Sequence, residues 1–137
     1  MDNKRIDERE SIYTRWTWKL MIDSHTHSKY SKHAVGEIEE VVISAINNNV
    51  KILTITDHAP FLIDVDNRLL MNELESYFND IECVQNKYRH EIKILKGIEA
   101  DYIPQHHKYT ENLISSLDLD FIIGSVHSVF LKEERIN

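Results

Sequence analysis

The stretch Lys51-Ile52-Leu53-Thr54-Ile55-Thr56-Asp57-His58-Ala59-Pro60 decides the fold. Its first half is an apolar, β-branched run, which predicts a buried strand near residues 51–56. Asp57 and His58 follow at once, and Pro60 marks the loop behind them. A continuous apolar strand that ends in polar side chains is typical of a parallel sheet with a site at one rim.

The same pattern recurs on both sides of this strand. Three further strands are predicted from apolar runs, near residues 20–25, 92–98 and 121–126. Amphipathic helices are predicted between the strands, near residues 36–48, 70–88 and 109–117. Alternation of strands and helices predicts an α/β fold of about four βα units, with a parallel sheet and helices packed outside it.

Residue types that bind metals follow every predicted strand. They are His25 and His27 after the first, His58 after the second, Glu99 after the third and His127 after the fourth. Each of them alone has an ordinary structural explanation, such as a loop histidine or a surface acid. The carboxyl ends of parallel strands face one common side, so four separate segments bring imidazoles and a carboxylate to one rim. Such nitrogen and oxygen ligands suit Zn²⁺, Mn²⁺ or Fe.

The clearest local motif is His25-Thr26-His27. Side chains two residues apart on an extended chain point the same way, so both imidazoles can hold one ion. His33 lies six residues further on. A carboxylate among histidines can bridge two ions, and Glu99 is the candidate here. Multi-metal sites of this kind bind both the attacking and the leaving oxygen in phosphoester hydrolysis, and they generate hydroxide near neutral pH.

Three other histidines are predicted to have surface roles. They are His90, between a helix and a strand, and His106 and His107, which open a helix after Pro104.

Composition narrows the function classes. The chain has 137 residues, enough for one domain, and a formal net charge of −7, which matches neither nucleic acid nor an anionic membrane. A bound metal would still attract a small anionic substrate. The single cysteine, Cys83, excludes an internal disulfide framework and is predicted to pack in a helix. No apolar run could span a bilayer and the start of the chain has no signal-peptide pattern, so we expect a cytoplasmic setting.

Four ordered motifs over about residues 20–130 resemble the PHP (polymerase and histidinol phosphatase) family, and most closely its histidinol-phosphatase branch. The motifs are Asp23-Ser24-His25-Thr26-His27 with His33-Ala34, Thr56-Asp57-His58-Ala59-Pro60, Gly97-Ile98-Glu99-Ala100-Asp101-Tyr102 and Gly124-Ser125-Val126-His127.

The resemblance implies a distorted (β/α)7 barrel with a trinuclear metal site. It implies that His25 and His27 bind one ion, that Glu99 bridges this ion to a second, and that His127 binds the second. It also implies that His33 and His58 bind the third ion, with Asp23, Asp57 and Asp101 supporting the ligands. The implied reaction is hydrolysis of the small phosphorylated substrate L-histidinol phosphate, a step of histidine biosynthesis, by hydroxide and without a protein nucleophile.

The family pattern continues with a further histidine and a late Asp-x-His, and nothing after His127 supplies them. We therefore expect residues 20–137 to be the N-terminal portion of a PHP domain whose C-terminal part is missing. Residues 1–19 are interpreted as an extension. A chain that begins at Met21 is expected to be nearly as stable as the longer one. We expect this chain alone to be a poor phosphatase that self-associates through its open sheet edges.

Several alternatives remain open at this point. A PHP phosphoesterase could act instead on phosphotyrosine, on nucleotides or on a DNA end, although the acidic charge disfavours DNA. Amidohydrolases also place a histidine pair after the first barrel strand, but they would want a bridging lysine, and Glu99 stands after the third strand instead. A truncated metal-binding fragment without activity is the alternative from outside the enzymes.

Overall fold

A computed structural model describes residues 20–131 and 134–136 and shows a four-stranded parallel sheet. The strands are β1 (Met21–Thr26), β2 (Val50–Ile55), β3 (Lys93–Asp101) and β4 (Phe121–Ser125), in the order β1-β2-β3-β4. All four predicted strands are therefore confirmed, each within a few residues of its expected place. The strand order follows the chain, as expected for successive right-handed βα units that curl into part of a barrel.

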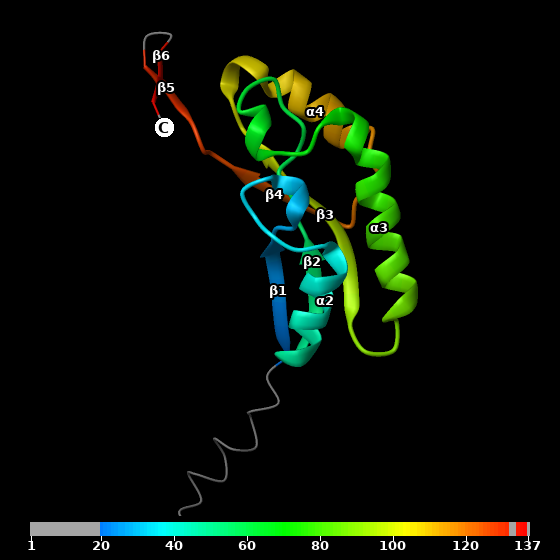
Figure 1. Ribbon diagram of the computed structural model, residues 1–137. Coiled ribbons are helices and arrows are strands. Elements are labelled where there is room, and N and C mark those ends of the chain that lie inside the picture. The colour runs from blue at the N-terminus through cyan, green and yellow to red at the C-terminus, as the bar shows by residue number, and fades with distance from the viewer. Residues whose placement is uncertain (1–19, 132–133, 137) are drawn as a thin grey trace, which may run out of the picture.

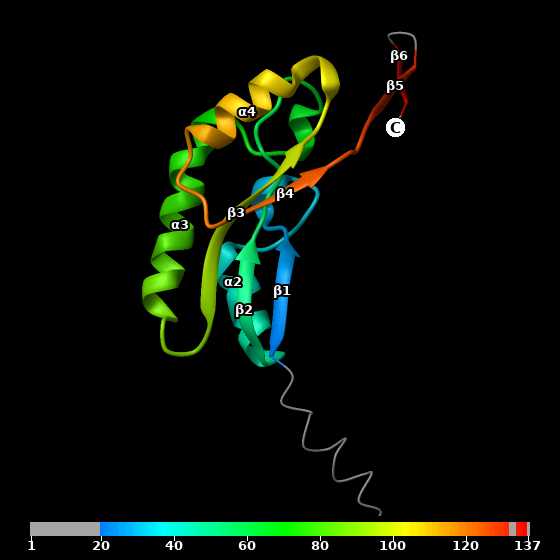
Figure 2. The same cartoon turned by 180° about the vertical axis from the view of Figure 1, so that it is seen from behind.

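The helices cover one face of this sheet, and the other face is turned to the viewer in Figure 2. They are α2 (Ile38–Asn47), α3 (Leu74–Lys87) and α4 (His107–Ser115). The core lies between the two layers. Its fully buried members include Val42 of α2, Tyr77 and Ile81 of α3, Leu53 of β2 and Ile98 of β3. Burial of these side chains holds the sheet to the helices and so fixes where each strand ends.

The ends of α2 follow from its sequence. The side chain of Glu40 accepts a hydrogen bond from the backbone N–H of Glu37 at 2.8 Å, which satisfies one free donor at the start of the helix. At the other end, Asn48 closes the last turn and Asn49 has a φ of 61°, a left-handed conformation that asparagine tolerates. The end of α2 at Asn47 agrees with the range of about residues 36–48 predicted for this helix.

The prediction for Cys83 is wrong. The buried residues of α3 include Tyr77, Ile81 and Val84, which lie at the spacing of one helix face. Cys83 is two positions from Ile81, about 200° around the helix axis, and is exposed.

The chain beyond β4 forms a hairpin that the sequence did not predict. Strands β5 (Val129–Leu131) and β6 (Glu134–Ile136) pair antiparallel and extend away from the sheet (Figure 1). Large apolar side chains are exposed on the edge strands, namely Met21 and Ile22 on β1 and Phe121 and Ile122 on β4.

The expected extension, residues 1–19 with Trp16 and Trp18, lies outside the described residues, so its dispensability stays a prediction. Within the described residues, no helix is both long and apolar enough to cross a membrane.

The middle of β3 requires a glycine. A Cβ atom at Gly97 would lie 2.7 Å from Cγ2 of Thr54 and 2.8 Å from the carbonyl oxygen of Ile55. Both distances are below van der Waals contact, and the backbone oxygen cannot turn away. We expect Gly97→Ala to lower the free energy of unfolding by about 1–3 kcal/mol, measured by urea denaturation. Gly124→Ala on β4 is the control, because its Cβ would meet nothing within 4 Å, and an equal loss in both variants would contradict the explanation.

Candidate metal centre

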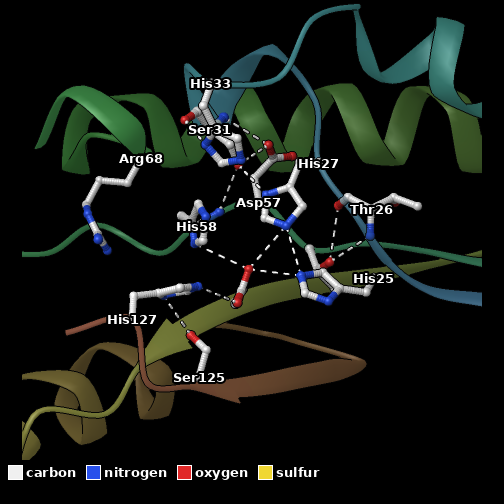
Figure 3. A network of polar contacts seen from close by, with 12 residues as sticks. His25, Thr26, His27, Ser31, His33, Asp57, His58, Arg68, Ser125 and His127 are labelled. Carbon is white, nitrogen blue, oxygen red and sulfur yellow. Dashed lines mark hydrogen bonds and ion pairs between the residues drawn. The ribbon is translucent and has the colours of Figure 1, made fainter. Parts of the chain in front are cut away.

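The six residues predicted to bind metal converge at the carboxyl end of the sheet. Figure 3 shows the five histidines of this set, His25, His27, His33, His58 and His127, gathered there. Glu99 lies at the centre and is only 2% exposed. Its Oε2 atom is 3.0 Å from Nε2 of His25, 3.1 Å from Nε2 of His27 and 3.3 Å from Nδ1 of His58. Its Oε1 atom is 3.2 Å from Nε2 of His127. One carboxylate therefore faces four imidazoles from three different segments.

An irregular strand end delivers the first two histidines. The register of β1 against β2 shifts between Asp23 and Thr26, so the strand does not run as a regular ladder there. Thr26 restores the pairing: its N–H donates to Oγ1 of Thr56 at 3.0 Å, and its hydroxyl donates to the carbonyl of Thr54 at 2.7 Å. The bulge leaves the Nε2 atoms of His25 and His27 only 2.9 Å apart.

Main-chain pairing holds His58 beside Glu99. The two residues form an isolated parallel bridge just beyond the end of β2. The Glu99 N–H donates to the carbonyl of Asp57 at 3.0 Å, and the Ala59 N–H donates to the carbonyl of Glu99 at 2.7 Å. Backbone hydrogen bonds therefore join the short loop after β2 to β3, and they fix the distance between His58 and Glu99.

The potential ligand atoms fall into three groups, within each of which they lie less than 4.8 Å apart. The groups are His25-His27-Glu99, His58-Glu99-His127 and His27-His33-His58. The grouping is more interlocked than the family resemblance implied, since His27 and His58 each belong to two groups. Neighbouring ions held by these groups would share ligands.

The electrostatics favour the unprotonated imidazoles that a metal requires. Burial lowers the pKa of His27, and burial lowers the pKa of His58 from 6.5 to about 4. Burial raises the pKa of Glu99, but the hydrogen bond to His25 and the charges of nearby histidines outweigh it, so the net pKa is lowered. The buried Nδ1 atom of His58 makes no hydrogen bond. The lowered pKa values of His27 and His58, the lowered pKa of Glu99 and the unsatisfied ring nitrogen of His58 together fit a divalent cation.

Asp57 is fully buried and organises the loop after β1. Its carboxylate accepts the N–H and hydroxyl of Ser28, both at 2.8 Å, and the N–H and hydroxyl of Ser31, at 2.9 and 2.7 Å. Ser31 stands in the short helical turn Lys29–Ser31. The family resemblance implied that Asp57 supports the ligands, but no role was predicted for Ser28 or Ser31.

Asp101 supports the other side of the site. It contacts Nδ1 of His127, and its Oδ2 atom lies 2.8 Å from the guanidinium of Arg68. Burial raises the pKa of Asp101, but the contacts with His127 and Arg68 overcome this and lower it. Arg68 is itself buried and donates to the carbonyl of Ala59 at 3.2 Å. No sequence signal identified Arg68, which lies in a loop without periodicity.

The remaining polar residues contribute less. Asp23 accepts only the backbone N–H of His25, at 3.3 Å, and no imidazole contact is seen for it among the described residues. His90 contacts Arg89, His106 packs on Phe61, and His107 contacts the carbonyl of Pro104. These three histidines lie outside the three ligand groups.

The lowered pKa of His58 predicts a pH-dependent stability for the metal-free protein. Above about pH 6.5 both the folded and unfolded states hold His58 neutral, so it has no effect. As the pH falls toward 4, His58 binds a proton in the unfolded chain but stays largely neutral in the folded state. The free energy of unfolding therefore falls, by at most about 3 kcal/mol. Urea unfolding in EDTA would measure this loss. We expect a weaker pH dependence in His58→Asn than in His90→Asn, and equal slopes would refute this origin.

Comparison with known proteins places the fold. The chain is 32% identical over 109 residues to a probable histidinol-phosphatase of Deinococcus radiodurans, a match covering 78% of this chain but 42% of that protein. A crystal structure from Listeria monocytogenes, a candidate histidinol phosphatase, superposes with a TM-score of 0.78 at 22% identity, covering 83% of this chain and 47% of that one.

A second crystal structure is the histidinol phosphate phosphatase of Lactococcus lactis, complexed with zinc, L-histidinol and phosphate. It superposes with a TM-score of 0.73 at 27% identity, covering 83% of this chain and 42% of that one. The chain thus spans less than half the length of each of these proteins. The sequence profile of the PHP domain matches residues 23–137, and the chain therefore belongs to the PHP domain family.

Proposed function

We propose that this chain is the N-terminal portion of a metal-dependent phosphatase that hydrolyses L-histidinol phosphate to L-histidinol and phosphate. The observation that carries the proposal is the set of three ligand groups that share Glu99, His27 and His58. Residues 20–137 would supply the first four βα units of the domain. The reaction would belong to histidine biosynthesis.

Each ligand-type residue has a place in this proposal. The assigned ligands are His25, His27, His33, His58, Glu99 and His127, and they would hold up to three divalent ions, zinc, manganese or iron. Bound ions of this kind act as Lewis acids on a phosphoryl group and activate water for attack. Zinc is supported by the metal in the Lactococcus lactis structure.

The chain's own residues would prepare the site before substrate arrives. Glu99 offers one oxygen to the His25 side and the other to the His127 side, so a single carboxylate bridges two positions. Asp101 orients His127 through its Nδ1 atom, which leaves Nε2 directed at Glu99. Arg68 neutralises Asp101 behind it.

The substrate is supported by relatives at modest identity, so the test must separate substrate from reaction class. The complete protein would be purified, its metals measured by elemental analysis, and phosphate release followed with L-histidinol phosphate, phosphotyrosine and AMP. We expect bound zinc or manganese, loss of activity in EDTA with recovery on metal addition, and kcat/KM for histidinol phosphate at least about 100-fold above the others. A preference for another monoester would overturn the substrate, and no turnover by metal-loaded protein would overturn the phosphatase.

A further inference from the structure

Ser31 contacts three of the histidines at the site, although it is not itself a ligand. Its hydroxyl oxygen lies 2.9 Å from Nδ1 of His27 and accepts the backbone N–H of His58 at 3.1 Å. Its backbone carbonyl oxygen lies 3.0 Å from Nδ1 of His33. The residue is fully buried, and its hydroxyl is bound to Asp57. His27, His33 and His58 together form one of the three ligand groups.

The directions of these hydrogen bonds can be deduced. A serine hydroxyl has one proton to donate and two lone pairs that accept. The carboxylate of Asp57 only accepts, so the single proton of Ser31 goes to it, at 2.7 Å. The backbone N–H of His58 occupies one lone pair. The remaining lone pair faces Nδ1 of His27, so this nitrogen must carry a proton and donate it.

The same reasoning applies to His33. A backbone carbonyl only accepts, so Nδ1 of His33 must also be protonated to bond to Ser31. In a neutral imidazole with Nδ1 protonated, the other nitrogen, Nε2, holds the lone pair. Nε2 of His27 is the atom that lies 3.1 Å from Oε2 of Glu99, inside the cluster.

We propose that Ser31 is a positioning residue that fixes His27 and His33 in the Nδ1–H form, so that both present Nε2 to a metal ion. The hydroxyl acts on His27 and the backbone carbonyl acts on His33. The buried carboxylate of Asp57 accepts the hydroxyl proton of Ser31, so the hydroxyl oxygen can only accept a hydrogen bond from His27. The metal-binding part of this inference rests on the proposed function, whereas the tautomers are properties of the metal-free chain.

Long-range ¹H–¹⁵N spectra of the histidine rings in metal-free protein test the tautomers directly, at about pH 8 where imidazoles are neutral. We expect His27 and His33 to be Nδ1–H in the wild type. Ser31→Ala should convert His27 to a mixture and leave His33 unchanged, since the backbone carbonyl remains. Ser28→Ala is the matched control, because it removes a hydroxyl from the same carboxylate without touching an imidazole. A wild-type His27 in the Nε2–H form overturns the inference even if Ser31→Ala fails to fold.

Zinc titration against a competing chelator gives the second readout. Ser31→Ala should bind zinc roughly 10–100-fold more weakly than Ser28→Ala, as expected when a ligand loses its orienting partner. Equal zinc affinity in the two variants, with unchanged His27, overturns the positioning role. If the wild type shows the expected tautomers but binds no zinc, manganese or iron, the proposed function falls while the assignment of the two tautomers to Ser31 stands.

Discussion

Replacing Glu99 by glutamine is expected to remove most of the bound metal and to lower phosphate release by at least about 100-fold. Glu99 belongs to two of the three ligand groups, and each of its oxygens faces a different set of imidazoles. An amide offers one oxygen and one NH₂ group, so it can serve at most one of the two positions. The NH₂ group would also face a ring nitrogen or a cation where an anion is needed.

Elemental analysis after dialysis and phosphate release from the complete protein measure both parts of this expectation. Glu91→Gln is the control, since Glu91 is exposed just before β3 and lies outside the ligand groups. His25→Ala and His27→Ala should also lose metal, and Glu99→Gln should lose at least as much as His25→Ala because the carboxylate is shared. Unchanged metal content in Glu99→Gln would refute the assigned role of Glu99.

The sequence predicted the fold well because its apolar runs are continuous. Parallel strands buried by helices need unbroken apolar residues, and these runs stand out against the polar ends that follow them. The partial PHP barrel with its parallel sheet is confirmed by the strand order and by the two superposed structures. The β5–β6 hairpin was missed, because a strand pair of three residues on each side is too short to show a period.

The candidate site was predictable only in part. The residues with ligand chemistry follow strands, and strand ends meet at one rim, so their convergence could be foreseen. Ser31 and Arg68 could not be found this way, because neither residue type is diagnostic and the carboxylates that they contact, Asp57 and Asp101, are remote in sequence. Ser31 meets His58 across 27 positions, and Arg68 meets Asp101 through a loop with no regular pattern.

Cys83 shows a different limit. Helical periodicity identified α3 correctly, but a residue between two apolar positions can lie on either side of the buried stripe. The helix rotates about 100° per residue, so Cys83 and Val84 are neighbours in sequence with opposite environments. Residues whose side chains suit both core and surface are therefore poorly placed by sequence alone.

Asp57→Asn is expected to be among the most destabilising single substitutions in the chain, lowering the free energy of unfolding by about 2–4 kcal/mol. The carboxylate is fully buried and accepts four donors from Ser28 and Ser31, two of them backbone N–H groups that cannot turn away. Three of these donors, both N–H groups among them, meet Oδ1, and the Ser28 hydroxyl meets Oδ2. An asparagine keeps only one accepting oxygen and places an NH₂ group where the other oxygen stood. Even with its oxygen in the Oδ1 place, the NH₂ group faces the hydroxyl of Ser28, and the negative charge that strengthens the other three hydrogen bonds is lost.

The loss should extend to the site, because the hydroxyl of Ser31 contacts both His27 and Asp57. A change at Asp57 is therefore expected to disturb the position of His27. Urea denaturation of metal-free protein measures the stability without any contribution from bound ions. Asp23→Asn is the matched control: this side chain is only partly buried and accepts a single N–H, which an amide oxygen can still accept. A loss in Asp57→Asn no larger than in Asp23→Asn would mean that the loop holds its shape without the carboxylate. The orientation of His27 by Ser31 would then not depend on Asp57, so this comparison tests how the site is held in place as well as the stability of the chain.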